Sequence, residues 1–112
     1  MQNHLMKLNS DSFDKIKEGS KIIEVRLFDE KRKLIDLGDT ITFQREPEKT
    51  KLLETSVIGL LRFNTFEDLI NDHPTISFGS DNKEELLNTI RKYYSSEQEK
   101  QYGALGIRIK VK

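Results

Sequence analysis

The chain has 112 residues, close to the usual size of one domain and enough to bury a single core. Nineteen basic residues balance nineteen acidic ones, which disfavours a broad nonspecific grip on duplex nucleic acid, because such binding needs a basic excess. Cysteine is absent, which excludes disulfides, zinc fingers and thiol catalysis.

The first predicted elements are a short strand over residues 4–8 and a helix that follows it. Ser10 or Asp11 is expected to cap the helix, because a short oxygen-bearing side chain satisfies the free amides of the first turn. Gly19 is well placed just after the last turn, where a left-handed backbone is needed. The helix is therefore expected to end at this glycine.

A second strand over residues 21–27 is predicted to separate apolar from charged side chains. Its apolar residues alternate and should face the core. Glu24 and Arg26 then share the opposite face, about 7 Å apart by strand rise. A charged turn and a strand over residues 40–44 follow.

The middle of the chain is predicted to hold a polar loop over residues 45–51 and a long strand over residues 52–63. That strand is apolar on both faces, so we expect it in the middle of the structure, covered on each side. Three helical segments and a last strand over residues 105–111 complete the chain. The capping patterns of these helices are Thr65 with Asp68, Asp81 with Glu84, and Ser96 with Glu99.

Runs of strands interrupted by helices in this order predict an α+β fold. We expect a closed or nearly closed, mostly antiparallel β-barrel of about five to six strands, with helices flanking it. No repeat, low-complexity segment or linker divides the chain, so a single domain over residues 1–112 is expected. No apolar run approaches the ~20 residues that span a bilayer, and no secretory signal pattern is present, so a cytoplasmic location is the default expectation.

The strongest candidate site is the segment of residues 19–26, where a helix end, a flexible glycine and three charged groups lie close together. Lys21 could hold an anion or, if desolvated, act as a base. Glu24 could accept a hydrogen bond from a base amine or a ligand hydroxyl, and the planar fork of Arg26 suits a carboxylate, a phosphate or a base edge. The plainer interpretation is a solvated strand face in which Glu24 and Arg26 neutralise each other.

The two histidines, His4 and His73, lie far apart in sequence and do not form a metal-spaced pair. No phosphate-binding glycine loop or nucleophile elbow is present. We therefore expect neither a metal nor a cofactor.

The same segment resembles the G-x-K-x-x-E-x-R signature of the ASCH family, and neighbouring blocks fit small bacterial members of it. These blocks are residues 6–8, 13–17, 26–32, 37–41, 63–69 and 93–103. The resemblance implies a PUA-like pseudobarrel and a role in RNA binding or RNA-linked metabolism. The ligand-binding residues it nominates are Gly19, Lys21, Glu24, Arg26, Asp39, Tyr94 and Tyr102. For the two tyrosines, stacking on a base competes with simple core packing.

One branch of small ASCH proteins hydrolyses N4-acetylcytidine with a lysine, a threonine and a glutamate. Lys21 matches this pattern, but Glu24 stands where the threonine nucleophile would be, and a carboxylate cannot be activated by proton removal in that way. The acidic member has only loose candidates, Asp81, Glu84 and Glu85. A different hydrolysis would use Glu24 as a base toward water and Lys21 to stabilise the oxyanion.

Three functions remain open. The first is a binding module for single-stranded RNA, a nucleotide or a modified nucleoside. The second is a small hydrolase acting on a modified nucleoside, with Lys21 and Glu24 as candidate catalytic residues. The third is an adaptor whose barrel face or C-terminal strand pairs with a protein partner. None of the three involves a membrane, and the pattern does not indicate an oligomeric state.

Overall fold

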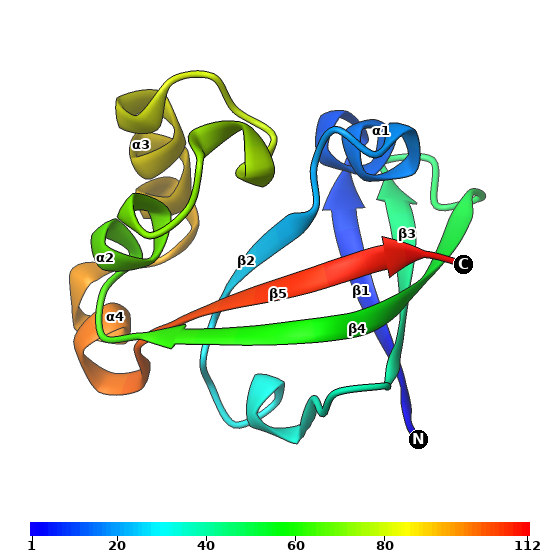
Figure 1. The fold of residues 1–112 in the computed structure, drawn as a ribbon, viewed down its shortest axis with the longest axis horizontal. Helices are drawn as coiled ribbons and strands as arrows, with labels where there is room; N and C mark the ends of the chain where they lie inside the picture. The colour runs from blue at the N-terminus through cyan, green and yellow to red at the C-terminus, as the bar shows by residue number, and fades with distance from the viewer.

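The computed structural model describes residues 1–112, which form an α+β fold built on one curled sheet (Figure 1). In chain order the elements are β1 (Asn3–Asn9), α1 (Ser10–Glu18), β2 (Ile23–Leu27), the 3-10 turn η1 (Arg32–Leu34), β3 (Thr40–Glu46), β4 (Leu52–Phe63), α2 (Phe66–Asn71), the 3-10 turn η2 (Thr75–Phe78), α3 (Lys83–Tyr93), α4 (Ser96–Tyr102) and β5 (Ala104–Val111). None of the helices is both long and apolar enough to cross a membrane.

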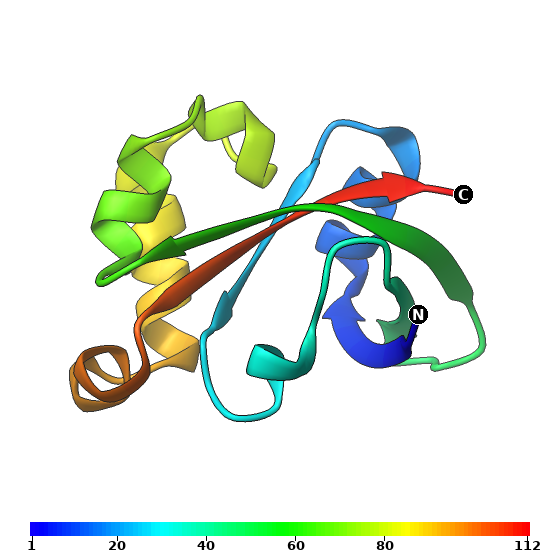
Figure 2. The same ribbon diagram turned by 60° about the horizontal axis from the view of Figure 1, so that its bottom comes forward.

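The five strands form a half-barrel that is open rather than closed. Their order is β1-β3-β4-β5-β2, so β1 and β2 are the two edges. β1 pairs with β3 in parallel, and the other three pairs are antiparallel. The mostly antiparallel sheet is therefore confirmed, while full closure is not, because β1 and β2 do not pair with each other. Figures 1 and 2 show β2 passing between α1 on one side and the α2–α3 helices on the other.

An apolar core lies on each face of the sheet. The inner core gathers side chains of α1, β1, β3, β4 and β5, and the outer core lies between the sheet and α2, η2 and α3. β5 serves both, since Leu105 and Ile107 belong to the inner core and Ala104 to the outer one. On the outer face a Cβ at Gly106 would come within 2.9 Å of Leu69, so this glycine allows α2 to pack close to the sheet.

Both faces of β2 are covered, which the sequence pattern alone does not predict. Ile23 belongs to the outer core, as its alternation indicates. Glu24 and Arg26 lie opposite Ile107 and Leu105 of β5, and partners across an antiparallel pair share one face of the sheet. The charged face of β2 therefore points to the inside of the half-barrel, and Glu24 is only 5% exposed.

β4 is the third strand of the five, as expected, but it is not covered on both sides along its whole length. Leu61 and Phe63 pack against the outer core, whereas Leu52 and Ile58 are exposed. The helices reach only one end of this strand, and a bulge between Val57 and Gly59 interrupts its register. The expectation of a fully covered strand is therefore wrong at its first half.

The capping residues of three helices lie one or two positions before or after the predicted ones. They are Asn9 for α1, Asn82 for α3 and Ser95 for α4, where the sequence predicts Ser10 or Asp11, Asp81 and Ser96. Neighbouring polar residues are equally able to cap, so the pattern predicts that a helix is present more reliably than it predicts where the helix begins. Thr65 caps α2 as predicted, accepting from the amide of Asp68.

β5 is an interior strand, flanked by β4 and β2. Over residues 104–109 its backbone is engaged on both sides, so this part of the C-terminal strand offers no free edge to a partner. Arg108 is exposed, but its stem packs over Gly59 of the neighbouring strand, so it covers the sheet rather than guarding an edge.

Candidate ligand-binding site

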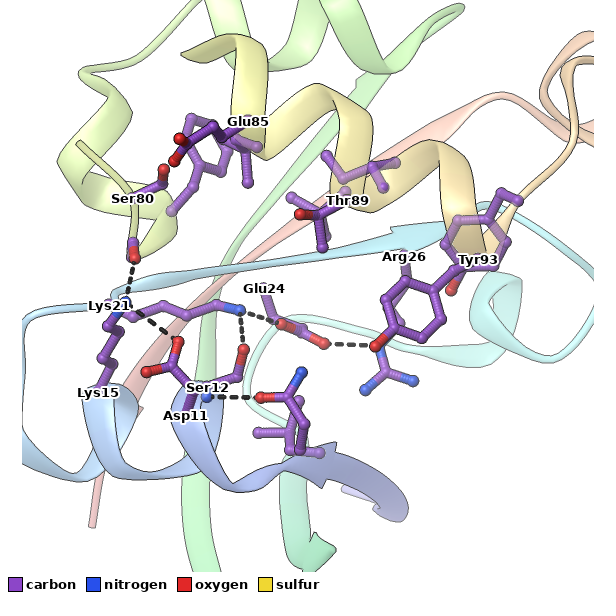
Figure 3. A pocket seen from close by; sticks show the side chains of 18 of the residues that line it. Asp11, Ser12, Lys15, Lys21, Glu24, Arg26, Ser80, Glu85, Thr89 and Tyr93 are labelled. Atoms are coloured by element: carbon purple, nitrogen blue, oxygen red, sulfur yellow. Dashed lines mark hydrogen bonds and ion pairs between the residues drawn. The ribbon is translucent and has the colours of Figure 1, made fainter. Parts of the chain in front are cut away.

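A cavity of about 340 Å³ opens along β2, between the end of β1 with α1 on one side and α3 on the other (Figure 3). This volume lies in the range of pockets that hold small ligands. Most of the charged side chains come from α1, β2 and the turn between them, whereas α3 supplies the aromatic and most of the apolar ones, together with the hydroxyl of Thr89. The lining residues used below are Lys7, Ser12, Lys21, Glu24, Arg26, Thr89, Tyr93 and Tyr94.

The cavity lies at the seam where the half-barrel fails to close. The edge strands β1 and β2 face each other across it without forming a ladder. One side chain bridges the gap, because Nη2 of Arg26 donates to the carbonyl oxygen of Lys7 at 2.8 Å. The seam therefore leaves room for a ligand while one charged fork holds its two sides together.

The turn between α1 and β2 brings Lys21 to the cavity. Gly19 ends α1 with φ of 88°, a left-handed conformation that favours glycine, and its amide donates to the carbonyl of Ile16. The chain then reverses, and the Lys21 side chain returns over the first turn of the helix. There its Nζ donates to Oγ of Ser12 at 3.1 Å.

Three charged side chains form a buried ion triplet on the cavity floor (Figure 3). Nζ of Lys21 lies 2.8 Å from Oε1 of Glu24, and Nε of Arg26 lies 2.7 Å from Oε2. All three side chains are largely shielded from solvent. With two positive charges and one negative charge, the triplet carries a net charge of +1.

The triplet fixes the charge state of Glu24. Burial disfavours the carboxylate, but the charges of Lys21 and Arg26 and their hydrogen bonds outweigh it and lower the pKa of Glu24 to about 2. For Arg26, burial opposes the charged form, yet the nearby Glu24 carboxylate raises its pKa above the usual value. Glu24 is therefore ionised at neutral pH, and both of its oxygens are already engaged.

A second bridge closes the other end of the cavity. Nζ of Lys15 in α1 donates to the carbonyl of Gly79, just after η2, at 2.8 Å. Gly79 has φ of 84°, and a Cβ there would come within 3.0 Å of the Lys21 stem. The backbone at Gly79 thus lies directly against Lys21 and limits where that side chain can go.

The structure brings four of the seven nominated residues to the cavity: Lys21, Glu24, Arg26 and Tyr94. Tyr94 also stacks on Phe66 of the outer core, with ring centroids 5.5 Å apart. Its side chain therefore both lines the cavity and packs in the outer core. Gly19 shapes the turn and is not part of the lining. Tyr102 packs against the outer core away from the cavity.

Asp39 also lies outside the cavity lining, just before β3. Its carboxylate accepts from Nε2 of His4 at 2.9 Å and from the backbone amides of Asp36 and Gln2. The hydrogen bond from His4, followed by the two amide bonds, lowers the pKa of Asp39 to about 2. This arrangement ties the start of β1 to the turn before β3, which is a structural use of the residue.

Several lining residues were not among those nominated from the sequence. Ser12 comes from α1, while Thr89 and Tyr93 lie four residues apart on α3 and so share one helix face. Tyr93 is 66% exposed although it continues an apolar stripe. In the sequence this stripe indicates core packing, so no local pattern marks Tyr93 and Thr89 as the wall of a cavity.

The model of the ASCH domain family matches residues 6–112 of the chain. No curated protein matches it. The crystal structure of the hypothetical protein PH0355 superposes with a TM-score of 0.87 at 33% identity, covering 100% of both chains. The solution structure of protein PF0455 from Pyrococcus furiosus gives 0.78 at 32% identity, covering 97% of this chain and 96% of the other.

A structure named as an ASCH domain, from Lactobacillus crispatus, has a TM-score of 0.63 at 15% identity. It covers 96% of this chain and 79% of that one, and the likeness is one of fold alone. The family match and the two more similar structures extend over nearly all of the chain. The chain therefore belongs to the ASCH domain family.

Proposed function

We propose that the cavity binds a nucleotide, a modified nucleoside or a few bases of single-stranded RNA. Recognition would use base-edge hydrogen bonds and stacking rather than a long phosphate track, in keeping with the balanced net charge. The observation that carries the proposal is the buried Lys21–Glu24–Arg26 triplet on the cavity floor.

The triplet is costly for the fold alone. Taking three charges out of water is expensive, and apolar side chains of similar size often stabilise such positions as well or better. Binding of a ligand would account for this cost. Glu24, Ser12 and the Lys7 carbonyl accept only some of the hydrogen bonds that the N–H groups of Lys21 and Arg26 can donate. The spare donors suit an acceptor on the ligand, such as a carbonyl or phosphate oxygen.

The α3 wall suits a flat ring. Tyr93 and Tyr94 both line the cavity, and aromatic side chains there can stack on a base with little sequence preference. Thr89 adds a hydroxyl that can donate or accept. A charged floor with an aromatic wall is a combination that fits a nucleoside better than a purely apolar or purely ionic ligand.

The charge state of Glu24 weighs against the hydrolase alternative. A general base works best when its pKa lies near the operating pH, and the pKa of Glu24 is about 2. Both carboxylate oxygens also face cations rather than a site for water. Binding without turnover is therefore the function that this geometry favours.

The test is an NMR amide titration of labelled protein with nucleosides, nucleotides and short single-stranded RNAs. We expect shifts that cluster at residues 21–26 and on the α3 wall, without product in the same samples. Arg26→Lys should weaken binding because it keeps the charge and loses the planar fork, whereas Arg108→Lys on the exposed face of β5 should not. A flat response across the panel contradicts the proposal and favours the adaptor.

A further inference from the structure

The open edge of β2 turns part of its backbone toward the cavity. Ile109 N–H donates to the carbonyl of Ile22 at 3.0 Å, and Phe28 N–H donates to the carbonyl of Gly103 at 2.9 Å. Both bonds fit the antiparallel register of β2 and β5, in which bonded pairs alternate with non-bonded pairs. The backbone N–H and C=O groups of the even-numbered residues of β2 therefore point to β5. Those of residues 23, 25 and 27 point away from it.

Val25 is the one of these three residues that lines the cavity. Its side chain packs against the outer core, and its backbone lies on the open edge of β2, next to the cavity-lining residues Glu24 and Arg26. Neither its N–H nor its C=O takes part in any hydrogen bond outside the strand ladders, and the register turns both away from the ladder with β5. Val25 thus presents an unused donor and an unused acceptor side by side.

The groups around this edge are mainly donors. Lys21 and Arg26 hold the floor, and both oxygens of Glu24 are already engaged by them. Across the seam, the Lys7 carbonyl accepts from Arg26, so the N–H of the same residue also points into the seam. At this edge a ligand therefore needs one donor for the Val25 carbonyl and acceptors for the Val25 N–H and for the spare donors of Lys21 and Arg26.

We infer that the cavity reads one nucleobase by a lactam edge, the –CO–NH– unit of uracil or guanine. In this arrangement Val25 N–H donates to a ring carbonyl, the Val25 C=O accepts from the adjacent ring N–H, and a further acceptor faces Lys21 and Arg26. Uracil fits best, because carbonyls flank its N3–H on both sides. Adenine has no carbonyl and fits least. The inference rests on the proposed function and names the ligand class for that same site.

A peptide strand added to the edge is the competing occupant, and the geometry disfavours it. Strand addition uses several consecutive open-edge residues. Here only Val25 lines the cavity, while α1 and α3 enclose it on either side. The space suits a compact planar ligand rather than an extended chain.

The first experiment compares uridine, 3-methyluridine and adenosine by ¹⁵N-resolved NMR titration. We expect uridine to shift the Val25 amide proton downfield. 3-Methyluridine loses the ring donor and leaves the Val25 carbonyl unpaired, so it should bind about tenfold more weakly, and adenosine should also bind more weakly. Equal affinity for uridine and 3-methyluridine would overturn the inference.

The outcomes separate the inference from the proposed function. If no nucleoside, nucleotide or RNA shifts residues 21–26, the proposed function fails and the inference fails with it. If uridine shifts Lys21 and Arg26 while the Val25 amide stays unchanged, the inference alone fails. A capped trialanine peptide that shifts Val25 where uridine does not would assign the edge to peptides and also overturn it.

A backbone variant supplies a second test. Val25→Pro removes the N–H at an edge-strand position where that group points away from the ladder, which is where strands tolerate proline. Leu5→Pro in β1 is the matched control. Thr40 N–H donates to the Gln2 carbonyl, so by alternation the Leu5 N–H also points away from the ladder, yet Leu5 does not line the cavity.

We expect Val25→Pro to weaken uridine binding about tenfold and Leu5→Pro to leave it unchanged, with both proteins folded by circular dichroism. A Val25→Pro protein that is folded and binds uridine normally would overturn the inference. If this variant does not fold, the comparison of uridine with 3-methyluridine decides.

Discussion

Glu24 is the residue on which the site depends, because it alone balances the two buried cations beside it. Removing one partner of a buried charge cluster leaves the others uncompensated, typically at about 3 to 5 kcal/mol. We therefore expect Glu24→Gln to lower the free energy of unfolding by about that amount, measured by urea denaturation. Glu30→Gln is the control, since Glu30 pairs with Lys33 at the surface, and its effect should stay within about 0.5 kcal/mol. Equal effects would show that the triplet contributes no more than a surface pair.

Gly19 and Gly79 share a left-handed backbone conformation but differ in what surrounds them, so alanine at each tests stability and the positioning of Lys21 separately. Gly19 and Gly79 both have φ near +85°, so alanine at either should cost about 1 kcal/mol of unfolding free energy. A Cβ at Gly19 would touch nothing within 4 Å, whereas one at Gly79 would lie 3.0 Å from the Lys21 stem. Gly79→Ala should therefore also displace the Lys21 ammonium signal in NMR and weaken nucleoside binding. Gly19→Ala should do neither, and identical spectra for the two variants would contradict this role of Gly79.

At the scale of elements, local patterns were the reliable part of the sequence. Gly19 at the end of α1, the alternation along β2 and the cap at Thr65 all follow from contacts a few residues apart, and the structure has them. Whether the charged face of β2 meets water depends instead on how the sheet curls. That curl is set by pairings between distant segments, such as β1 with β3 and β2 with β5.

The difference between local and distant contacts also explains which residues of the site the sequence pattern predicts. Lys21, Glu24 and Arg26 lie within six residues of one another, in β2 and the turn before it, so one motif contains them. Ser12 and Tyr93 reach the cavity from helices far apart in sequence, and no short pattern links them. Asp39 and Tyr102 belong to the sequence blocks that resemble the ASCH family, yet both lie away from the cavity. Asp39 stabilises the turn before β3, and Tyr102 packs against the outer core.

At the scale of the whole molecule, the open seam makes stability uneven across the sheet. β4 and β5 are interior strands paired on both sides, whereas β1 and β2 are each paired on one side only. Amides that point into the seam, such as those of Lys7 and Val25, should therefore exchange with solvent faster than that of Ile107 in β5. Hydrogen exchange followed by NMR checks this, and uridine should slow Val25 selectively. Equal protection of Val25 and Ile107 in the free protein would contradict an open seam.

The pH dependence of global stability should reflect mainly the two carboxyl groups whose pKa folding lowers to about 2, beside smaller contributions from Asp14 and Glu48, whose pKa is also lowered. Glu24 and Asp39 have pKa values of about 2 in the fold, against ordinary values of 4.5 and 3.8. Because each pKa is lowered by folding, its contribution is fully present above the ordinary value and is lost as pH falls toward 2. For the buried Glu24 the difference corresponds to about 3 kcal/mol.

Urea denaturation between pH 7 and pH 2.5 should therefore show a plateau above about pH 5 and a decline that begins near pH 4.5. Asp39→Asn should remove part of that decline and leave the remainder, because Glu24 lies at the seam and Asp39 at the distant turn held by His4. Sites so far apart, with no shared partner, contribute additively. A flat profile down to pH 2.5 would mean that the triplet is not formed as the structure has it. The predicted window between pH 4.5 and 2 thus tests, in one measurement on the unliganded protein, whether the charged floor of the cavity is assembled before any ligand arrives.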